Sequence, residues 1–324
     1  MSTMFYSVRH LTRFLYNAPI SESTMVVHMQ PRSELGQRCV QFELSTSPRA
    51  RVYAYRDHLG NVVHHFDIPA RHTQLRITAE ATVEVSPSVA IPEALGPDAW
   101  NALDSAARNG ENWEYLKPSV FVDRTAMLDD FAKELALDRT VDPLSLLLRI
   151  NAEIFHAFQY TPQSTQVDSP IDDALRARRG VCQDFAHIML ALVRPLGIPA
   201  RYVSGYLYQG EKNRDRSEVG ASHAWIEAWL PQLGWIGFDP TNNLVVEMRH
   251  VITAAGRDYS DVPPTRGVFK GTAASELSVA VVVSPSHAPR HDVDMPPGVT
   301  WVPPEPAEDE DEVRRQQQQQ QQQQ

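Results

Sequence analysis

The segment that most constrains the fold is GVCQDFAHIMLALVRPLGIPARYVSGYL, residues 180–207. Its apolar residues recur three and four positions apart, which predicts a helix with one buried stripe. Gly197 predicts the end of that helix, because glycine is the usual residue just past a helix C-terminus. The aromatic and branched residues that follow predict a strand. We therefore expect a mixed core packed around an apolar helix that opens with a cysteine, Cys182.

Residues 1 to about 90 have the pattern of strands. Runs such as RCVQFELSTS, RVYAYRD and LRITAEATVEV alternate between faces or are rich in branched residues. DHLGN, residues 57–61, holds the Asp, Gly and Asn of a turn between two such runs and predicts a hairpin. Consecutive hairpins predict an antiparallel β-sandwich. Prolines at 87, 92 and 97 favour neither strand nor helix, so we place the domain boundary there.

Helical signals begin after this boundary. DPLSLLLRINAEIFHAF opens with Asp142 as a helix cap and Pro143 in the first turn. SPIDDALRARRG has the same pattern, with Ser169 as the helix cap and Pro170 in the first turn. Gly180 is expected to end that helix. A β-domain followed by helices and further strands predicts the α+β class.

The chain is expected to divide into four segments. Residues 1–90 form the N-terminal β-domain, 91–140 a linker with helices, 141–286 an α+β core with its C-terminal strands, and 287–324 a tail. The tail combines six prolines, an acidic block and nine consecutive glutamines. Such a composition cannot bury a core, so the tail is predicted to be disordered.

Composition excludes several classes of partner. The formal net charge of −10 argues against nucleic acid, and no apolar run approaches the roughly 18 residues of a membrane span. The first residues lack the apolar region of a signal peptide, which favours the cytoplasm. The two cysteines, Cys39 and Cys182, are too few for a disulfide framework or a zinc cage. Cys39 lies in an alternating β-run and is expected to be structural.

The segment ASHAWIEAWLPQLGWIGFDPTN predicts two strands around a turn. Because side chains alternate between faces, the apolar residues of both strands share a face only if Trp229 pairs with Trp235, with 230–234 as the loop. The same register makes His223 and Asp239 diagonal neighbours, with Cβ atoms about 7 Å apart. One hydrogen bond can join an imidazole to a carboxylate across that gap.

Cys182, His223 and Asp239 have the chemistry of a cysteine nucleophile, its base and an orienting acid. A helix N-terminus and a neighbouring imidazolium both favour a thiolate, and backbone N–H groups at the helix start could stabilise an oxyanion. Each residue also has an ordinary explanation. Cys182 could be a small buried hydrophobe, His223 could cap a local carbonyl, and Asp239 before a proline is common in turns. Sequence pattern alone does not bring the helix to the hairpin.

The motifs G-x-C-x-D-F-A, G-I-P-A-R-Y-V-S-G-Y, S-H-A-W-x-E and G-W-x-G-F-D-P-T-N occur in this order. Together they resemble the core of the transglutaminase-like superfamily in its bacterial branch, and DHLGNVVHHF is similar to that branch's N-terminal β-domain. The resemblance covers roughly residues 4–284. It implies a papain-like α+β core with a catalytic triad of Cys182, His223 and Asp239. It implies no cofactor, and no clustered acidic loop suggests calcium.

Four further residues are candidates for the oxyanion or substrate site. Tyr160 could donate to the oxyanion, while Gln183 and Asp184 stand in the first helical turn, where a favourable charge on the helix dipole is an equal explanation. Trp225 shares the His223 face with two other tryptophans, at 229 and 235. These rings either wall a substrate cleft or pack against the N-terminal domain. No metal ligands are predicted.

These observations predict a cysteine-dependent acyl-transfer enzyme that acts on peptide or amide bonds through a thioester. Hydrolysis by a peptidase or amidase is favoured over Gln-Lys cross-linking, because no acidic pocket for lysine is evident. The alternative is a catalytically silent module of the same fold that binds peptides. The expected partner is a peptide or protein substrate, with no nucleic acid and no membrane, and the oligomeric state stays open.

Overall fold

The computed structural model describes residues 3–34, 36–87, 90–210, 213 and 215–288. The prediction of a disordered tail therefore falls almost entirely outside the described residues.

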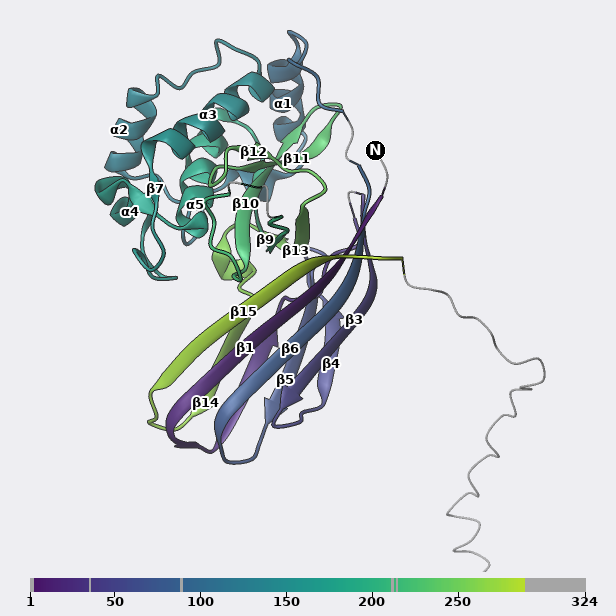
Figure 1. Ribbon diagram of the computed structural model, residues 1–324. Coiled ribbons are helices and arrows are strands. Elements are labelled where there is room, and N and C mark those ends of the chain that lie inside the picture. The colour runs from purple at the N-terminus through teal and green to yellow at the C-terminus, as the bar shows by residue number, and fades with distance from the viewer. Residues whose placement is uncertain (1–2, 35, 88–89, 211–212, 214, 289–324) are drawn as a thin grey trace, which may run out of the picture. The chain divides into compact units, whose positions relative to one another are not determined.

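Two four-stranded antiparallel sheets form the β-sandwich that was predicted for the N-terminal part (Figure 1). One sheet has the order β15-β1-β6-β3, made of β1 (Met4–Ile20), β3 (Gln37–Ser47), β6 (His72–Val85) and β15 (Ser275–Ser286). The other has the order β14-β2-β5-β4, made of β2 (Glu22–Val27), β4 (Val52–Arg56), β5 (Val62–Ile68) and β14 (Thr265–Lys270). Large side chains such as Phe66 and Leu75 are fully buried in one shared cluster of this sandwich.

The predicted hairpin at DHLGN joins β4 to β5. Arg56 pairs with Val62, so residues 57–61 form the connection. The Oδ1 atom of Asp57 accepts hydrogen bonds from the backbone N–H groups of Leu59 (2.9 Å) and Asn61 (2.8 Å). The aspartate thus closes the turn locally, as its sequence position indicates.

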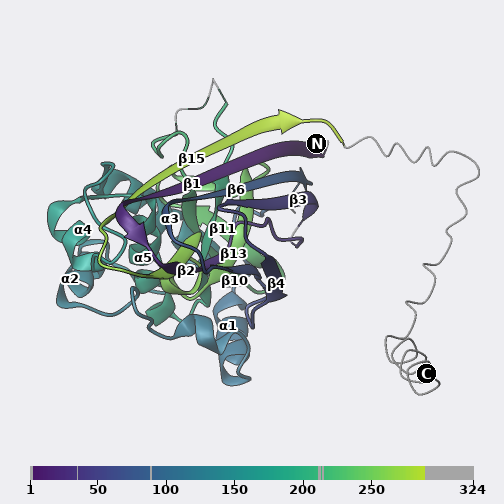
Figure 2. The same ribbon diagram turned by 90° about the horizontal axis from the view of Figure 1, so that it is seen from below.

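Two strands from the far end of the chain complete the sandwich. The sequence assigned the C-terminal strands to the 141–286 core, and this assignment is wrong for β14 and β15. β14 pairs with β2 and β15 pairs with β1 along twelve residues, from Phe5 opposite Ser286 to Tyr16 opposite Ser275 (Figure 2). Strand pairing across more than 230 residues leaves no local signal, so pattern alone could not detect it.

The second part of the chain is a five-stranded sheet covered by helices. The sheet order is β12-β11-β10-β9-β13, with β9 (Ala200–Leu207), β10 (His223–Leu230), β11 (Gly234–Asp239), β12 (Leu244–Val245) and β13 (His250–Gly256). The helices are α1 (Ala99–Arg108), α2 (Ala126–Glu134), α3 (Pro143–Ala157), α4 (Ile171–Ala177) and α5 (Cys182–Val193). α5 packs against β10 and β9, and its apolar stripe forms one cluster with α2, α3 and α4. α1 and α2 belong to this core and are not a linker, since Leu103 and Phe131 are buried in the same cluster.

The start of α3 agrees with the sequence prediction, whereas the end of α4 does not. Asp142 caps α3 by accepting from the N–H groups of Leu144 and Ser145, as predicted. α4, however, ends at Arg178, which has a positive φ of 50°, and Gly180 lies in a short strand beyond it. α5 ends before Pro195, and a single turn of 3-10 helix leads to Gly197 at φ 80°.

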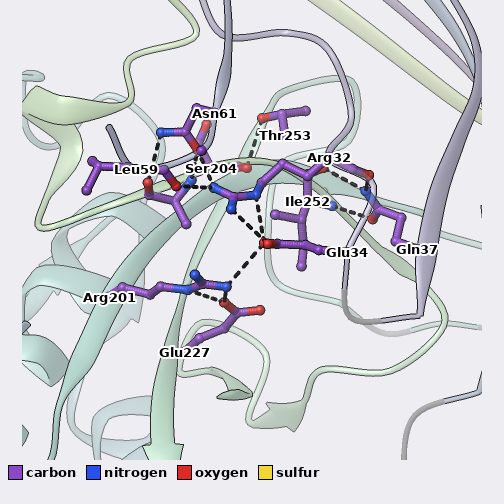
Figure 3. A network of polar contacts seen from close by, with 12 residues as sticks. Arg32, Glu34, Gln37, Leu59, Asn61, Arg201, Ser204, Glu227, Ile252 and Thr253 are labelled. Carbon is purple, nitrogen blue, oxygen red and sulfur yellow. Dashed lines mark hydrogen bonds and ion pairs between the residues drawn. The ribbon is translucent and has the colours of Figure 1, made fainter. Parts of the chain in front are cut away.

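A buried ionic network joins the sandwich to the core sheet (Figure 3). The Glu34 carboxylate lies between the guanidinium groups of Arg32 (2.6 Å) and Arg201 (3.2 Å), and Arg201 also pairs with Glu227 (2.6 Å). Gln37 uses both ends of its amide on the backbone of Ile252 in β13. These contacts fix Glu34 and Gln37 onto β9 and β13.

Candidate active site

The helix that carries Cys182 has a fixed starting point. Cys182 is the first residue of α5, and the parallel pair of β7 (Gln159–Tyr160) and β8 (Arg179–Gly180) leads the chain into it. The Oδ2 atom of Asp184 accepts from the N–H of Val181 (2.8 Å) and from the hydroxyl of Thr165 (2.6 Å). Asp184 therefore caps the helix that presents the thiol, and the structure places it in this positioning role.

Gly180 is needed for packing against α5. A Cβ atom at this position would lie 2.8 Å from Oδ2 of Asp184 and 3.1 Å from the ring of Phe185. The space beside the backbone is thus filled by the first turn of the helix itself.

We expect Gly180→Ala to destabilise the protein by about 1–3 kcal/mol, because the added methyl must displace Asp184 or the buried Phe185. Gly96→Ala is the matched control, since nothing lies within 4 Å of its Cβ position. Thermal unfolding of both variants checks the prediction. Equal melting temperatures for the two would show that the helix start tolerates the methyl.

The register of the β10–β11 hairpin is the predicted one. Trp229 pairs with Trp235, and Ile226 pairs with Phe238. The pairing extends one step further than expected, because Leu230 also pairs with Gly234 and the loop shortens to residues 231–233. The parity is unchanged, so His223 and Asp239 meet as inferred.

Asp239 holds the ring of His223 in a buried hydrogen-bond network. The Nε2 atom of His223 lies 2.8 Å from Oδ2 of Asp239, and Nε2 of His250 lies 3.2 Å from the same oxygen. Asn242 donates its side-chain N–H to Oδ2 (2.9 Å), and the backbone N–H of Thr241 donates to Oδ1 (3.0 Å). Burial alone would raise the pKa of Asp239, yet the positive ring of His223 and these hydrogen bonds hold that pKa well below its usual range. Asp239 is therefore a fixed negative charge.

Cys182 influences the His223 ring. Nε2 is used by Asp239, while the buried Nδ1 has no hydrogen-bond partner of standard geometry within the described residues. Cys182 favours the charged form of this ring, so we infer that its sulfur approaches from the Nδ1 side, the nitrogen that Asp239 does not use. Looser geometry of this kind is common before substrate binds. Burial disfavours a charged ring, but Asp239 outweighs it and, with Cys182, raises the pKa of His223 to about 10.

Tyr160 lies near Cys182. Burial raises the pKa of Tyr160 to about 12, and the charge of Cys182 adds to the effect. The phenol therefore stays protonated. Its oxygen accepts from the backbone N–H of Glu218 (3.1 Å), which leaves the hydroxyl proton free to be donated elsewhere.

Gln183 and Trp225 have structural positions. The side chain of Gln183 donates to the backbone oxygen of Val167 (2.9 Å) and holds the preceding loop on α5. Trp225 is fully buried and packs its ring against His223 and His250, with centroid distances of 5.9 and 5.1 Å. A side chain with no exposed surface cannot wall a substrate cleft, so Trp225 supports the histidine from behind.

Two members of the site were missed by sequence reasoning, His250 and Asn242. His250 stands alone in β13 and carries no motif, and β13 reaches the site only because it pairs with β9. Burial lowers the pKa of His250 despite the bond to Asp239, so its ring is neutral and donates to the carboxylate. Asn242 follows Asp239 within the quoted F-D-P-T-N motif, and this proximity was the available signal.

The donor atoms of His223, Asp239 and His250 lie within 4.8 Å of one another, a spacing compatible with a metal ion. The same atoms already form hydrogen bonds of 2.8 and 3.2 Å among themselves. We therefore interpret the group as a hydrogen-bond network that orients the histidine.

Comparison with known proteins agrees with this geometry. Residues 130–240 match the transglutaminase-like superfamily, and residues 6–84 match the bacterial transglutaminase-like N-terminal region. An uncharacterized protein of Mycobacterium leprae is 34% identical over 281 residues, which cover 86% of this chain and 97% of that protein. The chain belongs to the transglutaminase-like superfamily.

Other known proteins resemble parts or all of the chain. A protein-glutamine gamma-glutamyltransferase of Pseudomonas aeruginosa is 37% identical over 107 residues, 32% of this chain and 16% of that enzyme. The crystal structure of a candidate cysteine protease from Cytophaga hutchinsonii has a TM-score of 0.68 at 23% identity, covering 89% of this chain and 92% of that one. This likeness confirms the papain-like α+β fold.

Within the described ranges, none of the helices combines the length and apolar character that crossing a bilayer requires.

Proposed function

We propose that this transglutaminase-like protein is a cysteine-dependent acyl-transfer enzyme that acts on peptide or amide bonds, with hydrolysis as its main outcome. The observation that carries the proposal is the buried His223–Asp239 pair, whose imidazole is also influenced by Cys182. The carboxylate of this pair stays charged and holds the ring protonated near neutral pH. A silent peptide-binding module has no use for a charge pair buried at such cost.

The proposed reaction begins with the thiolate of Cys182. The sulfur attacks the carbonyl carbon of the amide, and the C=O electron pair moves onto oxygen. The N–H of Cys182 at the helix start and the hydroxyl of Tyr160 are the proposed donors to this oxyanion. As the intermediate collapses, the C–N bond breaks and the imidazolium of His223 gives its proton to the leaving nitrogen. This leaves a thioester and a neutral imidazole.

Deacylation reverses these roles. A water molecule gives a proton to the neutral His223 and attacks the thioester carbon, the C–S bond breaks, and the acid product leaves the thiolate beside a restored imidazolium. An amine in place of water would give cross-linking. Hydrolysis is favoured because the side chains around the cavity next to His223 are mostly aliphatic, and the Glu218 carboxylate in its lining is exposed to solvent.

The reactivity of Cys182 tests the proposal directly. We expect iodoacetamide at pH 6 to alkylate Cys182 at least tenfold faster than Cys39, because burial raises the pKa of Cys39 to about 11 and keeps it a thiol. His223→Ala should remove most of that advantage. Mass spectrometry of both cysteines in one sample gives the two rates with an internal control. Equally slow labelling of the two would favour the silent binding module.

The reaction outcome is read from a proteome-derived peptide library incubated with wild-type protein and with Cys182→Ala. We expect new amino and carboxyl termini that depend on Cys182. Added glycine methyl ester distinguishes the two outcomes, because a transferase would couple it to the acyl fragment. A cytoplasmic location is part of the proposal, since both cysteines are free thiols, and cell fractionation checks it.

A further inference from the structure

A small cavity lies against the catalytic histidine. Its volume is about 170 Å³, and His223 forms part of its wall. The remaining wall is contributed by the end of β9, by the 217–221 loop and by three consecutive valines of β15. We call this cavity the His223 pocket, and its main apolar residues are Leu207, Val219, Val281, Val282 and Val283.

The sandwich domain is needed to build the His223 pocket. β15 is an edge strand of the first sandwich sheet, and its partner there is β1 (Figure 2). The backbone N–H of Val281 donates to the oxygen of Gly220 at 2.7 Å, which holds the loop preceding His223 against β15. Val281 is buried in a cluster that also contains Tyr206 of β9 and Tyr6 of β1. The N-terminal domain, completed by β15, thus reaches the catalytic ring.

The chemistry of the pocket selects an apolar occupant. Two of its polar members, Gln209 and Ser217, are hydrogen-bonded to each other, at 2.9 Å between Nε2 and Oγ. Glu218 also lines the pocket but is solvent-exposed, so the branched aliphatic side chains set most of its character. A cavity of about 150 Å³ lined by such side chains holds one benzene-sized group. The His223 pocket therefore suits a single aliphatic side chain.

The role of His223 determines which residue of the substrate enters the pocket. An imidazole that protonates the leaving nitrogen lies on the leaving-group side of the scissile bond. The pocket beside that ring then receives the residue that follows the bond. We infer that β15 of the sandwich and the 217–221 loop form a specificity pocket for an aliphatic residue on the leaving-group side of the cleaved amide. This inference rests on the proposed function.

The test compares two valines on one strand. Val281 lines the pocket, whereas Val279 lies two residues earlier on the same face and does not. In the peptide library, each new amino terminus reports the residue that followed the cleaved bond. We expect valine, leucine and isoleucine to be enriched there with wild-type protein. Val281→Ala removes two methyl groups, so the kcat/KM ratio for phenylalanine over valine at that position should rise about tenfold.

Val279→Ala should leave this ratio unchanged.

A second variant keeps the inference testable if Val281→Ala does not fold. Val219 is 81% exposed, and Val219→Asp should leave folding intact and shift selection from leucine toward lysine. The inference is overturned by library cleavage without an aliphatic preference, or by equal ratios in the two alanine variants. Cys182 that alkylates rapidly but cleaves no peptide would overturn it as well, whereas slow alkylation would instead remove the proposed function.

Discussion

Asp239→Asn is expected to lower kcat by about ten-thousand-fold, the scale seen when the orienting acid of a serine-protease triad is changed in this way. The Asp239 carboxylate accepts hydrogen bonds from two imidazole rings, one side-chain amide and the backbone of Thr241. An asparagine keeps the shape but loses the charge and turns an N–H toward these donors. Burial then dominates at His223, so the ring loses its proton at neutral pH and no longer serves as the acid.

Asp258→Asn is the matched control for this variant. Asp258 is also fully buried and accepts from the N–H groups of Phe121 and Ser260, but it lies outside the proposed triad. The two variants should lose comparable stability, and only Asp239→Asn should lose activity. Steady-state kinetics on a library peptide gives kcat for both. Similar losses of kcat would show that the effect comes from general unfolding.

The difference in stability between the wild type and Asp239→Asn should depend on pH, because His223 and Asp239 both have shifted pKa values. The pKa of His223 is raised to about 10, so the stabilisation from its charged form is complete below about pH 6.5 and is lost as the pH rises through 10. The pKa of Asp239 is lowered, so its contribution is lost only as the pH falls below the usual range of a carboxyl group. The stability advantage of the wild type over Asp239→Asn should be largest between about pH 4 and 6.5. Melting curves from pH 4 to 10 measure this.

Arg201→Met is expected to destabilise the protein by about 3–5 kcal/mol, because it leaves the Glu227 carboxylate buried without its partner. Arg201 and Glu227 are 6% and 2% exposed, and Nε of Arg201 donates to Oε2 of Glu227 at 2.6 Å. Burial would lower the pKa of Arg201, but the carboxylates of Glu227 and Glu34 raise it. The guanidinium also lies 4.5 Å from the ring centre of Trp235.

The double variant Arg201→Met, Glu227→Leu should regain much of this stability, because no unpaired charge remains in the interior. Arg9→Met, in an exposed pair with Glu80, should change stability by less than about 1 kcal/mol. Denaturant unfolding of these three variants and the wild type checks both statements. A double variant no more stable than Arg201→Met would mean that the cost lies in packing and not in the buried charge.

The sequence by itself determined the local elements and the central pair of the site. Asp142 marks the start of α3 because a cap acts on its own neighbours. The meeting of His223 and Asp239 follows from the parity of one hairpin, in which a single-residue slip would expose the apolar side chains. Cys182 at the start of an apolar helix was equally visible.

Only the tertiary structure decided the rest, because those features depend on residues far apart in the chain. Trp225 is hidden by His250 and Gly205. His250 joins Asp239 because β13 pairs with β9. β15 reaches the His223 pocket through a pairing with β1 across the whole length of the core. Periodicity reports which face of an element is buried, but it does not report which distant element covers that face.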